Sequence, residues 1–326
     1  MELSKEIEER IAKLAEKYQA SGQDLVAYLD GLLYADYITY WDYIHLDTLL
    51  SLQNPRTSIP DEEIFIMYHQ ITELYFKLSL HEMEQLRGME SVTAEVLKEK
   101  VLRINRYFGA LTHSFGVMTQ GMRREEFLKF RMSLMPASGF QSVQYRLIEV
   151  AATDFINLVD KDVRDEMKED THSIKDMYQH IYWKKGATIE GSGDKTLTLK
   201  QFEKKYTEEI IRFAKKFKEA NLWQIFKGLT AEEQQDTELR NAFRMLDINV
   251  NVNWPLQHYK TSVTYLAKRP HDIAATGGTN WQKYLPPRFQ KRIFYPELWS
   301  ATEIEEWGRG WVESVLEEVR FGENVN

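Results

Sequence analysis

Residues 61–88, DEEIFIMYHQITELYFKLSLHEMEQLRG, decide the fold of this chain. Asp61, Glu62 and Glu63 follow Pro60, and acidic residues suit the first turn of a helix because they complement the helix dipole. Apolar residues then recur at the spacing of one helical face: Ile64, Met67, Ile71, Leu74 and Leu78. This stretch therefore predicts a long helix.

Shorter stretches with helical spacing lie on both sides of this segment. We expect helices within residues 1–35, 93–120, 123–132, 141–159, 241–269 and 301–319. The chain has only 16 Gly and 8 Pro among 326 residues, which disfavours a turn-rich all-β fold. We therefore predict an all-α fold and one helical domain over residues 1–326, with an N-terminal arm (1–35) and a more polar helical insertion (about 160–240).

Charge and composition exclude several classes of function. The chain has 42 Lys and Arg against 50 Asp and Glu, whereas a nucleic-acid partner requires a basic excess or patch. It has no cysteine, which excludes disulfides, zinc–thiolate sites, iron–sulfur clusters and cysteine nucleophiles. The N-terminal MELSKEIEERIAKLAEKY is unlike a signal peptide, and no apolar stretch is long enough to span a membrane. We expect a cytoplasmic protein without nucleic-acid or membrane partners.

The familiar metal- and phosphate-binding motifs are absent. The sequence has no HExxH, EF-hand, GxSxG, GxGxxG or GxxxxGK pattern. The residues that could bind a metal or cofactor are therefore mainly the histidines, carboxylates and tyrosines. A haem remains possible, because its iron needs only one axial imidazole from the protein.

His69 lies inside the apolar helix, one turn after Phe65 on the same face. Such a face could form one wall of a pocket for a flat aromatic ligand, with the imidazole offering one hydrogen bond. A core histidine bonded to a backbone carbonyl explains the same pattern. The spacing alone leaves both interpretations open.

Arg131 follows Phe127 by one turn and precedes a Ser-Gly loop. Its planar guanidinium could hold a substrate carboxylate through two parallel hydrogen bonds, although an ordinary ion pair is the simpler interpretation. His258, one turn after Trp254, could be an axial ligand or an ordinary core or surface histidine. The loop ATGGT at 275–279 could bind a carboxylate through its backbone N–H groups, or merely turn the chain.

The order of these motifs resembles the tryptophan 2,3-dioxygenase family. Two runs are the most specific: F-x-x-x-H-Q-x-x-E-L-x-F-K from Phe65, and F-R-x-x-L-x-P-x-S-G-F-Q-S from Phe130. They are preceded by YWDYIHLDTLLSLQ and followed by WPLQHYKTSVTYL and TGGT, so the likeness spans roughly residues 36–160 and 240–300. The resemblance implies an all-helical, haem-dependent dioxygenase with haem b buried between helices. It also implies a homotetramer built as a dimer of dimers.

The resemblance assigns a role to each matching position. His258 matches the axial ligand of the haem iron, and Ser138 and Gly139 match the chain that passes close to the haem. His69 matches the histidine that hydrogen-bonds the substrate's indole N–H. The other substrate contacts are the indole walls Phe65 and Phe127, the carboxylate clamp Arg131, and the loop residue Thr276. Tyr40, Tyr43 and Ile44 match a segment that a neighbouring subunit contributes to the pocket; packing of these tyrosines on one helical face is the simpler interpretation.

In this family, ferrous haem and dioxygen open the indole ring of L-tryptophan to N-formyl-L-kynurenine, the first step of the kynurenine pathway. The segment after TGGT departs from the family pattern, because NWQKYLPP stands where small residues and Gly are usual. Trp281 could reshape the amino-acid end of the pocket. This departure motivates a second hypothesis, a haem oxygenase of the same fold acting on a modified tryptophan or another indole. A third hypothesis is a non-catalytic haem or tryptophan sensor.

Overall fold

The computed structural model describes residues 3–35, 38–167, 171–189, 192–266 and 286–308. It divides the chain into two units, Met1–Gln53 and Asn54–Asn326, which are described separately below. Within the described ranges the secondary structure is helical, with two isolated β-bridges and no strand. The predicted all-α fold is therefore confirmed.

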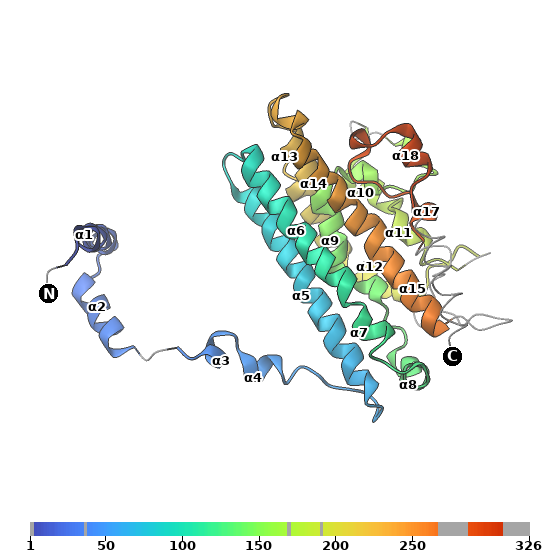
Figure 1. The fold of residues 1–326 in the computed structure, drawn as a ribbon, viewed down its shortest axis with the longest axis horizontal. Coiled ribbons are helices and arrows are strands. Elements are labelled where there is room, and N and C mark those ends of the chain that lie inside the picture. The colour runs from blue at the N-terminus through green and yellow to red at the C-terminus, as the bar shows by residue number, and fades with distance from the viewer. Residues whose placement is uncertain (1–2, 36–37, 168–170, 190–191, 267–285, 309–326) are drawn as a thin grey trace. The chain divides into compact units, whose positions relative to one another are not determined.

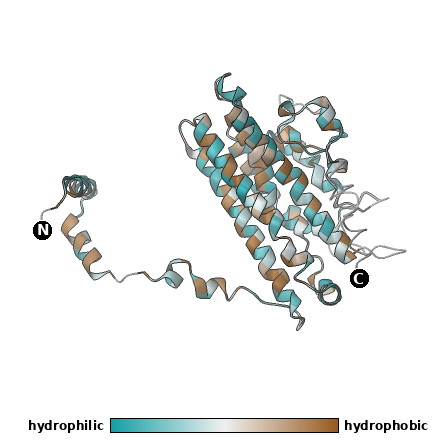
Figure 2. Cartoon of the chain, in the orientation of Figure 1, coloured by the Kyte–Doolittle hydropathy of each residue, from teal (hydrophilic) through white to brown (hydrophobic). Residues whose placement is uncertain are grey.

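The first unit is a series of helices in which no residue is fully buried within one chain. Its helices are α1 (Lys5–Ala20), α2 (Leu25–Tyr34), α3 (Tyr40–Tyr43) and α4 (Leu46–Leu49). None of their residues is buried, although α2 is hydrophobic along most of its length (Figure 2). Apolar surface of this extent is typically covered by a partner.

The second unit is a helical bundle. Its described α-helices are α5 (Asp61–Gly88), α6 (Ala94–Ser114), α7 (Gly116–Thr119), α8 (Arg124–Phe130), α9 (Val143–Ala152), α10 (Ile174–Gln179), α11 (Tyr182–Lys185), α12 (Leu197–Phe217), α13 (Leu222–Lys227), α14 (Thr237–Ile248), α15 (Trp254–Leu266), α17 (Pro287–Gln290) and α18 (Ala301–Glu305). Shorter turns of 3₁₀-helix are η1 (Arg131–Leu134), η2 (Gly139–Gln141), η3 (Phe155–Leu158), η4 (Arg164–Glu166), η5 (Glu233–Gln235) and η7 (Pro296–Leu298). One π-helical turn, η6 (Asn249–Asn253), joins α14 to α15.

Long helices run side by side in this bundle (Figure 1). α6 packs against α5 and against α14, while α9 packs on α5 and α12 packs on α9. The helix expected over residues 93–120 breaks after Ser114, and the chain restarts as α7. The more polar region 160–240 includes α12, which places Leu199, Phe202 and Phe217 in the main hydrophobic core.

Most of the apolar series that marks α5 in the sequence faces outward in the single chain; Ile64, its first member, packs against a core cluster. Met67, Ile71, Leu74 and Leu78 are 40–50% exposed. The opposite face is buried against α6 and α9 and carries Tyr68, Thr72, Phe76, Ser79, Met83 and Leu86. The regular apolar stripe of this helix therefore remains uncovered in the single chain.

Glu62 fixes the start of α5, the helix that carries Phe65 and His69. Its buried carboxylate accepts hydrogen bonds from the backbone N–H groups of Arg56 and Thr57, both at 2.8 Å, and from the Thr57 hydroxyl. Burial opposes ionisation, but these hydrogen bonds outweigh it and lower the pKa of Glu62. The carboxylate thus ties the preceding loop to the first turn of the helix.

We expect Glu62→Gln to destabilise the fold by about 2 kcal/mol at pH 7, because the amide cannot accept all three hydrogen bonds. The pKa of Glu62 is lower in the folded protein than its ordinary value of 4.5. The stability that its ionised form contributes is therefore fully present above pH 4.5, and it is lost as the pH falls through the pKa of the folded protein. Urea unfolding at several pH values measures the difference between variant and wild type. The difference in unfolding free energy should become smaller in acid. The control is Glu63→Gln, a change at the exposed neighbouring residue, which should alter the unfolding free energy little at any pH.

Candidate functional site

His69 is held in one tautomer by its own helix. Its Nδ1 lies 2.7 Å from the carbonyl oxygen of Phe65 on α5, and a carbonyl can only accept, so Nδ1 carries the proton. Burial lowers the pKa of His69, which favours the neutral ring. The neutral ring leaves Nε2 as a hydrogen-bond acceptor. The Phe65 ring packs against the imidazole, with 4.1 Å between ring centroids.

His258 lies on α15 and is also held in the neutral form. Burial, with a smaller contribution from the charge of His69, lowers the pKa of His258 to about 4. The two histidines, far apart in sequence, therefore lie within electrostatic reach of one another. The Phe115 ring stacks near the His258 ring, at 6.4 Å between centroids and 29° between planes. A neutral imidazole is the form that can donate a lone pair to a metal.

Aromatic side chains connect the two histidines. Tyr68 and Phe115 belong to one buried cluster, against which Phe65 and Phe127 pack. The Phe65 and Phe127 rings lie 6.1 Å apart, and Phe127 lies 4.8 Å from Tyr265 on α15. The helices that meet here are α5, α8 and α15. Their side chains form a predominantly apolar environment of the kind that binds flat aromatic ligands.

Arg131 follows directly on α8, the helix that carries Phe127. Its side chain is buried, and burial lowers the pKa of its guanidinium, although an arginine remains protonated at neutral pH. The helix that precedes Arg131, α8, packs against both α5 and α15, the helices that carry the two histidines. A buried guanidinium can bind a carboxylate through paired hydrogen bonds.

The loop before α9 approaches the His258 ring. The Ser138 hydroxyl accepts a hydrogen bond from the backbone N–H of Phe140 at 3.3 Å, and the Gln141 side chain accepts one from the N–H of Ser138. These bonds shape the short helix η2. A Cβ added at Gly139 would lie 3.8 Å from Cε1 of His258. The absence of a side chain at this position therefore leaves space between the loop and the imidazole.

The structure brings Phe65, His69, Phe127, His258 and Gly139 into one region. Arg131 and Ser138 lie on the chain that links α8 to Gly139.

The remaining candidates belong to other segments of the chain. Tyr40 and Tyr43 are on α3 of the first unit and are 70% and 73% exposed; Ile44, which ends that helix, is partly buried. Thr276 lies outside the described residues.

Sequence analysis missed the residues that join the two histidines. Tyr68 packs edge-on against His69, with 5.9 Å between ring centroids, and lies 5.7 Å from Phe115. The Tyr265 hydroxyl donates to the carbonyl oxygens of Met118 and Met122, which ties α15 to the chain around α7. Tyr68 could have been suspected from its place next to His69, whereas Phe115 and Tyr265 carry no local signal.

Metal-binding clusters, membrane-spanning helices and cavities were the other features relevant to function in the described residues. No three His, Asp or Glu side chains among them gather as a metal site. Within the same residues, no helix is both long and apolar enough to cross a membrane. A cavity of about 390 Å³ lies between α9, α10 and α12, and none of the candidate residues lines it.

Comparison with known proteins gives consistent matches. Residues 32–179 match the family model for tryptophan 2,3-dioxygenase. A tryptophan 2,3-dioxygenase of Ruegeria sp. (strain TM1040) is 42% identical over 118 residues, which span 36% of this chain and 42% of that relative. One from Bacillus thuringiensis subsp. konkukian (strain 97-27) is 28% identical over 281 residues, 81% of this chain and 91% of the relative. One from Polaromonas sp. (strain JS666 / ATCC BAA-500) is 27% identical over 80% of this chain and 86% of the relative.

Proposed function

We propose that this chain, which belongs to the tryptophan 2,3-dioxygenase family, uses haem b and dioxygen to open the indole ring of L-tryptophan, giving N-formyl-L-kynurenine. The observation that carries the proposal is the convergence of two neutral histidines, His69 and His258, in one aromatic cluster. Each histidine alone has an ordinary structural explanation. Their convergence beside Phe65 and Phe127 supports a site for a cofactor and a flat substrate.

The residues around His258 fit a haem. The imidazole is neutral without having to release a proton, and Gly139 leaves room at its edge where a larger side chain would extend. His258 would hold the haem iron, and Ser138 and Gly139 would lie beside the haem. Bound there, the haem supplies the iron at which dioxygen reacts. The protein's contribution is then to place the indole and to exclude water.

The other site residues would fix the substrate by complementary chemistry. Phe65 and Phe127 would pack on the indole, and Nε2 of His69 would accept the hydrogen bond of the indole N–H. Arg131 would bind the carboxylate, and Thr276 would contact the amino-acid part. Holding both ends of the substrate converts binding into correct orientation of the C2–C3 bond, which supplies much of the rate. No strong base is required, so a neutral His69 is sufficient.

We further propose that the protein acts as a homotetramer, a dimer of dimers, in the cytoplasm. Two apolar surfaces support an assembly: the first unit, whose helices bury no residue, and the outward stripe of α5 around Ile71 and Leu74. Such exposed surfaces are typical of subunit contacts. Tyr40, Tyr43 and Ile44 would then complete the pocket of a neighbouring subunit.

The hydrogen bond assigned to His69 can be measured with a substrate methylated at the indole nitrogen. We expect wild-type protein to show a KM about tenfold higher for 1-methyl-L-tryptophan than for L-tryptophan, because one hydrogen bond is lost. In His69→Ala the two KM values should be nearly equal. His113→Ala, a change at an exposed histidine, should keep the wild-type difference. If His69→Ala still discriminates tenfold, the indole N–H is bound by another group.

Substrate choice tests the proposed function. Haem-loaded, reduced protein is supplied with L-tryptophan and, separately, with ring-methylated and β-methylated tryptophans, and product is followed by absorbance and mass. We expect L-tryptophan to give the highest kcat/KM. Oxidation of only the methylated substrates would indicate a related indole oxygenase. A tryptophan-induced change in the haem spectrum without any product would indicate a sensor.

A further inference from the structure

The helix that carries His258 begins with a change of helical geometry. The chain passes from α14 through the π-helical turn η6, Asn249–Asn253, into α15, and His258 lies five residues after Asn253. A π turn contains an extra residue compared with an α turn, so it rotates every following side chain about the helix axis. The direction in which the His258 side chain projects therefore depends on whether the chain keeps this π-helical turn.

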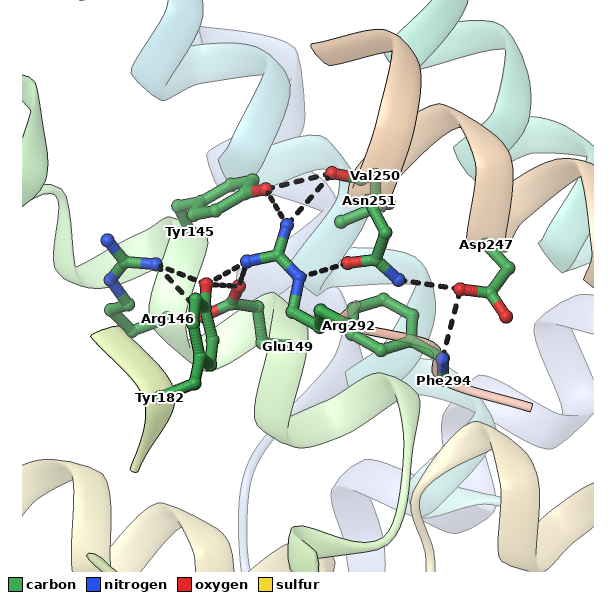
Figure 3. Close-up of polar contacts among 9 residues, drawn as sticks. All are labelled: Tyr145, Arg146, Glu149, Tyr182, Asp247, Val250, Asn251, Arg292 and Phe294. Atoms are coloured by element: carbon green, nitrogen blue, oxygen red, sulfur yellow. Dashed lines mark hydrogen bonds and ion pairs between the residues drawn. The ribbon is translucent and has the colours of Figure 1, made fainter. Parts of the chain in front are cut away.

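Side chains from outside the helix hold the turn at Val250. The Val250 carbonyl oxygen accepts hydrogen bonds from the Tyr145 hydroxyl of α9, at 2.9 Å, and from Nη2 of Arg292, at 3.2 Å (Figure 3). Nη2 of Arg292 also donates to the Tyr145 hydroxyl at 2.8 Å. All three residues are buried. The two donors come from segments far apart in sequence and converge on one carbonyl of the π turn.

A second set of contacts holds the turn at Asn251. Nε of Arg292 donates to Oδ1 of Asn251, whose Nδ2 donates to Asp247 at 2.6 Å (Figure 3). Asp247, one turn earlier on α14, accepts the backbone N–H groups of Phe294 and Tyr295 at 3.0 and 3.2 Å. The segment around Arg292 is therefore fastened to both sides of the π turn.

Arg292 pairs with a buried carboxylate inside the bundle, and Arg146 shares that carboxylate. Nη1 of Arg292 donates to Glu149 and to the Tyr182 hydroxyl, and Glu149 also accepts from Arg146 at 3.1 Å. The guanidinium of Arg146 lies 5.4 Å from the ring centroid of Phe140, the residue after Gly139. The same buried network thus reaches His258 from two sides: through the π turn, and through the loop that approaches the imidazole.

We propose that Arg292 and Tyr145 are positioning residues: they hold the π turn at Val250 and thereby fix the direction in which His258 presents its imidazole to the haem. Neither residue needs to touch the substrate or the cofactor. The inference rests on the proposed function only in taking haem as the group that His258 binds. The holding of the turn itself is a property of the haem-free protein.

Amide hydrogen exchange on haem-free protein tests the first half of the proposal. Tyr145→Phe removes one hydroxyl and leaves no unpaired charge, so the variant should fold, while Arg292→Met removes both contacts to the turn. We expect exchange over residues 250–258 to accelerate about tenfold in Tyr145→Phe and more in Arg292→Met. The matched control is Arg244→Met, because Arg244 anchors the same C-terminal segment at Leu298 and Glu303 without touching the turn.

The iron–histidine stretching band of the ferrous haem protein, read by resonance Raman, tests the second half. Disappearance of this band in His258→Ala would assign it to the bond between the iron and His258. We expect it to shift or broaden in Tyr145→Phe and Arg292→Met and to stay unchanged in Arg244→Met. If Tyr145→Phe folds and leaves both exchange and band at wild-type values, or if Arg244→Met changes them equally, the proposal is wrong. Wild-type protein without any such band would contradict the proposed function instead, and the exchange measurement would still decide whether the two residues hold the turn.

Discussion

His258→Ala is expected to weaken haem binding by about 100-fold or more and to abolish oxidation of L-tryptophan. Loss of a residue that merely supports a metal ligand typically costs 10–100-fold in affinity, so loss of the ligand itself should cost at least as much. Burial and the neighbouring His69 lower the pKa of His258 to about 4, so its imidazole is neutral and can bind a metal without releasing a proton. Titration of haem into haem-free protein, followed by the Soret band, measures the effect.

A change at a histidine away from the site separates ligand loss from general damage. His81 is exposed on α5, the same helix as His69, and His81→Ala should bind haem like the wild type. Added imidazole should partly restore the Soret spectrum of His258→Ala by entering the space of the missing ring. Wild-type affinity in His258→Ala would show that another residue holds the iron.

Arg131→Met is expected to raise the KM for L-tryptophan roughly 150-fold, which corresponds to about 3 kcal/mol for a paired charge-assisted hydrogen bond. The methionine fills a similar volume, so the fold should tolerate it. The KM of Arg131→Lys should lie between those of the wild type and Arg131→Met, because lysine keeps the positive charge but lacks the planar guanidinium that makes two parallel hydrogen bonds. Steady-state kinetics with L-tryptophan measure the loss.

The substrate supplies the control for this prediction. Tryptamine has no carboxylate, so its weak binding should be nearly the same in wild-type protein and in Arg131→Met. An equal loss of affinity for tryptamine and for L-tryptophan would mean that Arg131 supports the structure of the pocket rather than holding the carboxylate.

The candidate site could be predicted from sequence where chemistry and spacing occur together. The runs around His69 and Arg131 carry several chemically distinctive residues at fixed spacing, and their order along the chain gave the resemblance to the family whose model matches residues 32–179. The helix Asp61–Gly88 was predicted closely because acidic residues after Pro60 mark its start and its helical spacing is long and regular.

The burial pattern of that same helix could not be predicted. The stripe of Met67, Ile71 and Leu74 has the periodicity of a core face, yet it is exposed in the single chain, and Tyr68 and Phe76 point inward. Periodicity reports an apolar face but does not say whether a core or another subunit covers it.

The π turn and its supports also escape sequence reasoning. NVNVN at 249–253 has ordinary helical surroundings, and one extra residue in a turn leaves no periodic signal. Arg292 comes from a segment with no helical pattern of its own, and its partner Glu149 lies on α9, far away in the sequence. Such contacts are set by tertiary packing, which a single sequence does not display.

The most direct measurement is the mass of the product formed from L-tryptophan and ¹⁸O₂ by the haem-loaded, reduced protein. The proposed function predicts N-formyl-L-kynurenine that carries two ¹⁸O atoms, with no product from His258→Ala. A product with a single ¹⁸O atom, or no oxidation of L-tryptophan by protein that binds haem through His258, would contradict it.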